Sequence, residues 1–390
     1  MPPGELSAAP GAAGIERLIG LLQAAQLQLL RVLDALGLVP QVHGQPAWPW
    51  AWRLSGENLL IDAGQARNLA WTLACIGAAL LVLALALPWR RARWHLLALV
   101  PMLLLAAPWP APRVLAVPAT PASFHASPTG FTAASIVRGR VLYAAHCAAC
   151  HGADGRGEGP LAAALPMWPP DLGGPLLWRR ADGDLLWRIL HGMRDAGPDG
   201  RPTMPGFAAT LDADDAWALI DYMKAQGAGR SLRTLGRWTQ PVGLPDMAVR
   251  CGARPARALA SWRGQRLRLV AGDAAPAEDP RLVTVQLLPP QGAGTLAGAA
   301  DCVADSPAAW EALALIAATA RLAGTQFIAD RDGWLRALGE PGKAGWSDDD
   351  LLCRSDGAAP PPAPAADGLG ALIARMDAQP VRLVKGGFIH

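Results

Sequence analysis

The chain of 390 residues is long enough for two or three domains of ordinary size. Its net charge is +3 and charged residues make up only 17% of it, so it has no strongly basic field and no nucleic-acid partner is expected. The mean hydropathy is positive, which favours membrane-embedded segments.

Residues 1–68 form an N-terminal tail in which one amphipathic helix is predicted, over residues 15–38. Arg17, Arg31 and Asp34 lie within this segment and argue against a membrane span. The helix either lies at a membrane interface or is the remainder of a larger membrane domain. The sequence favours neither alternative.

Two transmembrane helices are predicted within residues 69–112. Residues 69–88 contain no charged side chain and have about the 20-residue length that crosses a ~30 Å hydrocarbon core. Residues 95–112 are also uncharged, but prolines interrupt them, the first at position 101. The alternative for this pair is a buried helical hairpin in a soluble protein.

The loop between the two predicted spans, residues 89–94, contains three arginines flanked by two tryptophans. Arginines in short loops favour the cytoplasmic side, and tryptophans favour the membrane interface. The loop is therefore expected in the cytoplasm, with the N-terminal tail and everything after about residue 112 outside. Residues 113–132 are then a linker to the next domain.

Cys147, Cys150 and His151 form a Cys-x-x-Cys-His motif. Thiols at this spacing reach both vinyl groups of one porphyrin, and the adjacent histidine meets the iron. The alternatives are half a zinc site, which needs another Cys/His pair, and a redox Cys-x-x-Cys, which follows a buried strand. No such pair follows here, and a helix is predicted before the motif, over residues 133–145. Haem attachment in bacteria requires export, in agreement with the predicted topology.

Residues 136–227 are similar to the class I c-type cytochrome family, and a cytochrome domain is expected over residues 133–228. The resemblance lies in the stretch RGRVLYAAHCAACHGADGRGEGPLAAALP, in the segment TMPGF, and in an apolar closing helix. The matching residues are Gly139, Tyr143, Cys147, Cys150, His151, Gly159, Pro160, Met204, Trp217, Ile220 and Tyr222.

This resemblance implies an all-α domain that holds one covalent haem c per chain. It implies that His151 is the proximal iron ligand and Met204 the distal one. It also implies that the Pro160 carbonyl accepts a hydrogen bond from the other imidazole nitrogen, as partners of metal ligands often do. An iron with both axial positions filled has no open site for a substrate, so a carrier is expected and not an enzyme.

Four other residues compete for roles at the iron. Met193 and Met167 are alternative thioether ligands, and packing near the haem edge is the simpler reading of both. His191 is an alternative imidazole ligand, and a histidine interacting with the end of a helix is its simpler reading. His146 is expected to face solvent.

Residues 240–390 are predicted to form an α/β domain. Strands are predicted over residues 266–271, 282–288 and 325–329, a helix over residues 308–322, and a hairpin turn over residues 330–333. This order favours a mixed sheet.

The segments SWRGQRLRLVA and GTQFIADRDGWLRAL resemble the thioredoxin-like domain of peroxiredoxin-related and Sco-type copper-chaperone proteins. That family has a Cys-x-x-Cys after its first strand, whereas Gly-Asp-Ala-Ala-Pro follows Ala271 here. Thiol and copper chemistry are therefore in doubt. A disulfide is expected between Cys251 and Cys302 or between Cys302 and Cys353, or else these are separate thiols.

The whole chain is thus predicted to be multidomain, with two transmembrane helices, an all-α cytochrome domain and a thioredoxin-like α/β domain. Its order is similar to that of cytochrome-fused copper-resistance D-type membrane proteins. The main hypothesis is an electron carrier in the bacterial inner membrane, with its cytochrome and C-terminal domains in the periplasm. Its partners would be membrane lipid and redox proteins of the respiratory chain or periplasm. The alternatives are a haem-linked thiol-redox or copper-chaperone protein, and a haem sensor with a displaceable Met204.

Overall fold

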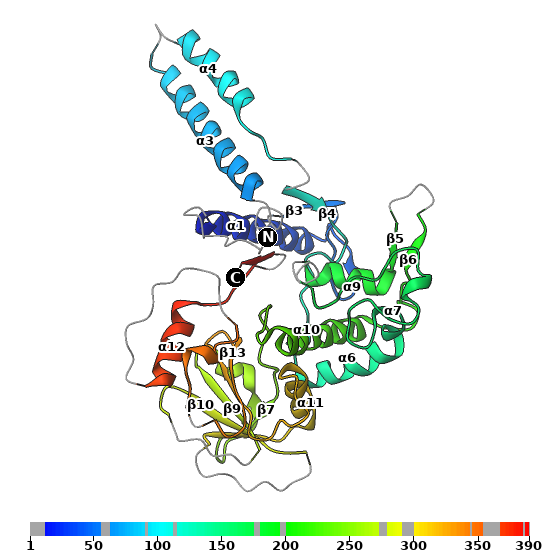
Figure 1. Ribbon diagram of the computed structural model, residues 1–390. Helices are drawn as coiled ribbons and strands as arrows, with labels where there is room; N and C mark the ends of the chain where they lie inside the picture. The colour runs from blue at the N-terminus through cyan, green and yellow to red at the C-terminus, as the bar shows by residue number, and fades with distance from the viewer. Residues whose placement is uncertain are drawn as a thin grey trace. The chain divides into compact units, whose positions relative to one another are not determined.

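The computed structural model contains two compact units, Met1–Pro121 with Val384–Ile389 and Ala122–Leu383 (Figure 1). The residues that the structure describes are 12–55, 63–89, 93–111, 115–174, 180–195, 200–272, 279–290, 300–343, 345–353, 367–384 and 387–389.

The first unit combines a long helix, a helical hairpin and short β-ribbons. Its elements are α1 (Ala12–Ala35), β1 (Gln41–Val42), β2 (Gln45–Pro46), β3 (Trp52–Leu54), α3 (Ala63–Ala86), α4 (Arg93–Ala106) and β4 (Ala116–Pro118). Strands β14 (Arg382–Val384) and β15 (Gly387–Ile389) form a two-stranded sheet at the end of the chain. β3 pairs antiparallel with β4, so the chain entering α3 is joined to the chain leaving α4. The helix predicted over residues 15–38 is α1.

One helix in the described part of the chain is long and apolar enough to cross a membrane, judged by length and composition. Within α3 this segment is Arg67–Ala86, which has 20 residues. α4 is also apolar, but with 14 residues it is shorter than this length criterion requires. It stops at Ala106 because Pro108 and Pro110 lack the N–H groups that would continue the helix. Most of the predicted arginine loop, residues 90–92, lies outside the described residues.

The second unit begins with four helices and a small hairpin. They are α6 (Ala133–His146), α7 (Ala148–His151), α9 (Asp182–His191) and α10 (Ala213–Leu235), with a 3-10 turn at Ala162–Ala164 and strands β5 (Met193–Arg194) and β6 (Pro202–Met204). α6 and α10 cross closely at Gly139, where an added Cβ would lie 2.0 Å from the Ala218 carbonyl oxygen. Trp217, Leu219 and Ile220 of α10 are buried in the core that these helices share.

A five-stranded mixed sheet follows, as predicted. Its strands are β9 (Leu267–Ala271), β10 (Val283–Leu287), β11 (Cys302–Ala304), β12 (Gln326–Ala329) and β13 (Leu335–Gly339), in the order β11-β10-β9-β12-β13. β9, β10 and β11 are parallel, and β12 is antiparallel to both of its neighbours. The remaining elements are β7 (Ala248–Val249), β8 (Arg257–Ala258), α11 (Pro307–Ile316), α12 (Gly368–Ala378) and two 3-10 turns.

α11 is shorter than predicted, because the chain leaves the helix after Ile316. Ala318 adopts a φ of 53°, which is left-handed and incompatible with continuing a right-handed helix. The sequence contains no glycine or proline there to signal the end of the helix.

A second hydrophobic core joins the helices of this unit to the sheet. Ile136 of α6 and Ala225 and Ala228 of α10 are buried in the same cluster as strands of the sheet. Gly229 allows α10 to approach α11, since an added Cβ would lie 1.9 Å from the Leu315 carbonyl oxygen. An ion pair of 2.7 Å between Arg140 of α6 and Glu311 of α11 lies on the outside of this junction.

Cys251 and Cys302 form a disulfide, which is one of the two predicted pairings. Arg250 and Val303 exchange two backbone hydrogen bonds of 2.9 and 2.8 Å, and this pairing brings the neighbouring cysteines together. Cys353 is buried and free, and burial raises the pKa of its thiol to about 11.

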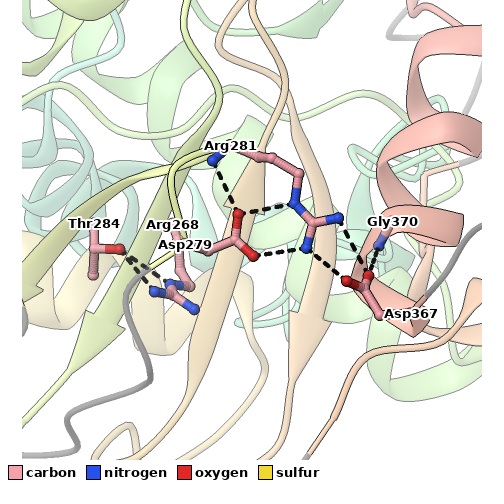
Figure 2. Close-up of polar contacts among 6 residues, drawn as sticks. All are labelled: Arg268, Asp279, Arg281, Thr284, Asp367 and Gly370. Carbon is pink, nitrogen blue, oxygen red and sulfur yellow. Dashed lines mark hydrogen bonds and ion pairs between the residues drawn. The ribbon is translucent and has the colours of Figure 1, made fainter.

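A charged cluster ties the loop before β10 to the start of α12 (Figure 2). The Arg281 guanidinium donates to Asp279 at 2.7 Å and to Asp367 at 3.1 Å. Asp367 also caps α12 by accepting from the Gly370 N–H. Beside this cluster, the buried Arg268 of β9 donates to the Thr284 hydroxyl of β10 at 2.9 Å.

Replacing Asp279 by asparagine is expected to destabilise the second unit more at pH 7 than at pH 2. The hydrogen bond from Arg281 lowers the pKa of Asp279 from 3.8 to about 2. The ionised carboxylate therefore stabilises the fold above about pH 4, and this contribution is lost as the pH falls through about 2. Urea unfolding at both pH values measures the difference. The exposed Asp305→Asn is the control, and the same pH dependence in both variants would contradict the prediction.

Candidate functional site

Two residues of the predicted haem motif, Cys150 and His151, lie on the single turn of α7, and Cys147 is the residue directly before it. Cys147 ends α6 and precedes α7, and the His151 N–H donates to the Cys147 carbonyl at 2.9 Å. Cys147, Cys150 and His151 are all half-buried, and both thiols are free of disulfides. Burial, with a smaller effect of Cys150, raises the pKa of the Cys147 thiol to about 12. The turn thus presents two thiols and an imidazole together.

A glycine-rich segment folds back on this turn and holds it. The Gly157 N–H donates to the His151 carbonyl at 2.8 Å, and the Gly159 N–H donates to the Cys150 carbonyl at 3.1 Å. Gly157 has a φ of 86°, and an added Cβ would lie 2.1 Å from the Pro169 carbonyl oxygen. Both the backbone conformation and the space therefore require glycine at this position.

Gly157→Ala is expected to lower the free energy of unfolding by about 3 kcal/mol, since left-handed strain adds to a backbone collision. Gly252→Ala is the matched control, because Gly252 also has a positive φ, 58°, but has no atom within 4 Å of its added Cβ. This control is expected to cost only about 1 kcal/mol. Denaturant unfolding compares the two variants, and equal losses would show that the collision with Pro169 does not occur.

Two tyrosines and a glutamine hold the backbone that follows His151. The Tyr143 hydroxyl donates to the Gly152 carbonyl at 2.8 Å. The Gln226 amide donates to the Ala153 carbonyl at 2.7 Å and to the Tyr222 hydroxyl at 3.0 Å. Burial raises the pKa of Tyr143 well above its usual range, so this hydroxyl stays a donor. The sequence analysis did not predict a role for Gln226. The only sequence signal for it is a polar residue four positions after Tyr222.

The imidazole of His151 is enclosed by the same segment. Burial lowers its pKa, and a smaller, opposite effect comes from the Pro170 carbonyl. Its Nδ1 atom is buried and makes no hydrogen bond of normal geometry within the described part of the chain. The resemblance predicts the Pro160 carbonyl as the hydrogen-bond acceptor of this nitrogen, and that pairing stays a prediction.

Met204 lies at the end of β6, directly opposite Met193 of β5. Side chains directly opposite each other on antiparallel strands lie on the same face of the ribbon. Both methionines are half-buried. The hairpin is fastened to α9, because the Phe207 N–H donates to the Ile189 carbonyl at 3.0 Å. The two methionines therefore occupy equivalent places on one anchored hairpin.

Of the three other competing residues, His191 and His146 pack near the segment that carries Met204. His191 ends α9 and stacks on Trp187, with 3.8 Å between ring centroids. The His146 ring lies 6.0 Å from the Phe207 ring. Met167 is exposed, at 52%.

The donor set fits a covalently attached haem. Cys147 and Cys150 have free thiols that would form thioethers with its vinyl groups. His151 would supply an imidazole nitrogen to the iron, and the thioether of Met204 belongs to the same compact unit. Within the described ranges, no three His, Cys, Asp or Glu side chains gather as a metal-ion site would need. The structure gives no support to the alternative that the two thiols form half of a zinc site.

Comparisons with known proteins agree with this assignment. Residues 134–223 match the family described as cytochrome C oxidase, cbb3-type, subunit III. A chain of the Kuenenia stuttgartiensis reducing HAO-like protein complex is 24% identical over 28% of this chain and 50% of its own length, with a TM-score of 0.23. This chain thus spans half the length of that relative, and the likeness is too slight to carry an argument. The comparison with curated proteins found no match.

Proposed function

We propose, from the premise that residues 134–223 form a c-type cytochrome domain with a covalently bound haem c, that this protein is a membrane-anchored carrier of single electrons. When bound, the haem iron supplies one-electron exchange. Cys147 and Cys150 hold the porphyrin as thioethers, His151 is the proximal ligand and Met204 the distal one.

The main support for this proposal is that the two segments carrying His151 and Met204 are both held in place by hydrogen bonds. The His151 turn is held by Gly157, Gly159 and Tyr143, and the Met204 hairpin is fastened to α9. If His151 and Met204 both ligate the iron, no iron position would be open, which would suit electron transfer and disfavour substrate or gas binding. A thioether ligand also favours the reduced iron and raises the potential.

The proposed anchor is the α3 segment Arg67–Ala86, whose 20 predominantly apolar residues match the thickness of a bilayer. α4 packs beside α3 in the hairpin and would share the membrane with it as the second, shorter span. Since haem attachment occurs after export, we place the cytochrome and C-terminal domains in the periplasm, at the bacterial inner membrane. Tethering then raises the local concentration near membrane-bound redox partners.

The α/β part is proposed to be thioredoxin-like, on the strength of its strand order and directions. It lacks the thiols that such a domain needs for redox or copper chemistry. Gly272 follows β9, Cys251 and Cys302 are joined, and Cys353 is buried. This arrangement supports the electron carrier over the thiol-redox or copper-chaperone alternative.

Met204→Ala is expected to abolish the weak sulfur-to-iron absorption band of the oxidised protein and to lower its midpoint potential. Met193→Ala is the matched control, because Met193 is the cross-strand partner in the same hairpin, and its band is expected to persist. The opposite pattern would assign the ligand to Met193. Fast, stoichiometric binding of carbon monoxide to the reduced wild-type protein would contradict a closed iron site.

A further inference from the structure

Helix α1 has an apolar stripe that nothing in the described part of its unit covers. Leu21, Ala25, Leu29, Val32 and Leu36 recur every three or four residues, so they line one side of the helix. All five are exposed, and Leu21 and Leu36 are exposed by 68% and 65%. An exposed apolar stripe of this length is typical of an interaction surface.

The other side of α1 is fixed to protein. Gln26 and Leu30 are buried. The Gln26 side chain forms two hydrogen bonds with the Leu54 backbone, donating to the carbonyl at 2.9 Å and accepting from the N–H at 2.7 Å. The buried Gln26 amide thus hydrogen-bonds to β3 as the backbone of a neighbouring strand would. This contact determines which side of α1 faces away from β3.

Strand β3 lies at the open end of the helical hairpin, where the chain enters α3 and leaves α4. It pairs with β4, which follows α4, and the Ser55 N–H donates to the Leu115 carbonyl at 2.7 Å. The Thr72 hydroxyl of α3 donates to the Pro108 carbonyl at 3.0 Å, which closes the same end of the hairpin. If α3 crosses the bilayer, this closed end lies at the membrane surface, and α1 is held to it.

Two exposed tryptophans lie at the start of β3 and two residues before it. Trp50 and Trp52 are exposed by 47% and 56%, and tryptophan prefers the membrane–water interface. We infer that α1 is an in-plane interfacial helix whose stripe, Leu21 to Leu36, is covered by lipid. The occupant is the boundary between headgroups and acyl chains, which takes a helix with one apolar side. This inference rests on the membrane anchoring proposed above.

Spin labels on the full-length holoprotein in phosphatidylcholine–phosphatidylglycerol vesicles test the inference. The free Cys75 is first replaced by alanine. Cys353 is buried with a raised pKa, Cys251 and Cys302 are joined, and the haem takes Cys147 and Cys150, so a new cysteine is labelled selectively. The labels are placed by Leu29→Cys and Leu36→Cys in the stripe, with Arg31→Cys as the exposed control on another side of α1.

The measurement is the collision rate of each label with oxygen, which concentrates in lipid, and with a water-soluble nickel chelate. The oxygen-to-nickel ratio is expected to be several-fold higher at positions 29 and 36 than at position 31. A low ratio at all three positions would show that the stripe faces water. Low rates with both reagents at positions 29 and 36 would show that protein covers it, and either result would overturn the inference.

A fourth label, Leu80→Cys in the middle of α3, separates this inference from the anchoring itself. Leu80 is exposed by 62% and lies within the candidate span. A high ratio at position 80 with a low ratio in the stripe would refute the interfacial helix alone. A low ratio at position 80 would refute both the anchoring and the inference that depends on it.

Discussion

Gly139→Ala is expected to lower the free energy of unfolding by about 3 kcal/mol, the upper end of what overpacking costs. The added Cβ would meet the Ala218 carbonyl oxygen at 2.0 Å and the Tyr222 Cβ at 2.7 Å. The first contact is with helix backbone, which cannot rotate away as a side chain does. α6 and α10 must therefore separate, and the turn that carries the haem ligands lies directly after α6.

Denaturant unfolding of the holoprotein, followed by its haem absorbance, measures this effect. Val141→Ala is the control on the same helix, because Val141 is exposed by 62% and its truncation is expected to cost no more than about 0.5 kcal/mol. A Gly139→Ala protein as stable as the control would show that α6 and α10 do not cross at this glycine.

Replacing both Cys147 and Cys150 by serine is expected to remove covalently bound haem completely. Serine keeps the size of each side chain but has no thiol to add across a vinyl group. Haem staining after denaturing electrophoresis is the measurement, since only covalent haem survives it. Each single replacement leaves one thioether and is expected to reduce the stain without abolishing it.

Cys75→Ser is the matched control for the double replacement. Cys75 is also a free thiol, but it lies in α3, away from the Cys-x-x-Cys-His turn in the sequence. Full staining is expected for this variant. Persistent staining of the double serine variant would contradict the attachment site.

Local patterns in the sequence were sufficient for the haem turn and for most of the sheet. The spacing of Cys147, Cys150 and His151 specifies one helical turn, and the apolar runs that became β9, β10 and β12 are compact and bounded by polar residues. β11 was not predicted, because three residues are too few to show a period. α12 was also not predicted from the sequence.

Local sequence patterns could not predict features that depend on contacts between residues far apart in the chain. Gly229 looks like an ordinary helix-weakening glycine, and its role appears only when Leu315 is brought against it. The choice between two disulfides depended on the pairing of Arg250 with Val303, which no local signal encodes. The early end of α4 has a local cause instead. The predicted span over residues 95–112 is longer than α4 because Pro108 and Pro110 end the helix.

Helix α10 belongs to two cores at once, since Trp217 and Ile220 face the haem-binding helices while Ala225 and Ala228 face the sheet. The cytochrome and the α/β part therefore share α10 and belong to one compact unit. A protein that recognises the sheet would thereby also set the distance and orientation of the haem. The α/β part would then select which redox partner comes within tunnelling range of the haem, without itself taking part in the electron transfer.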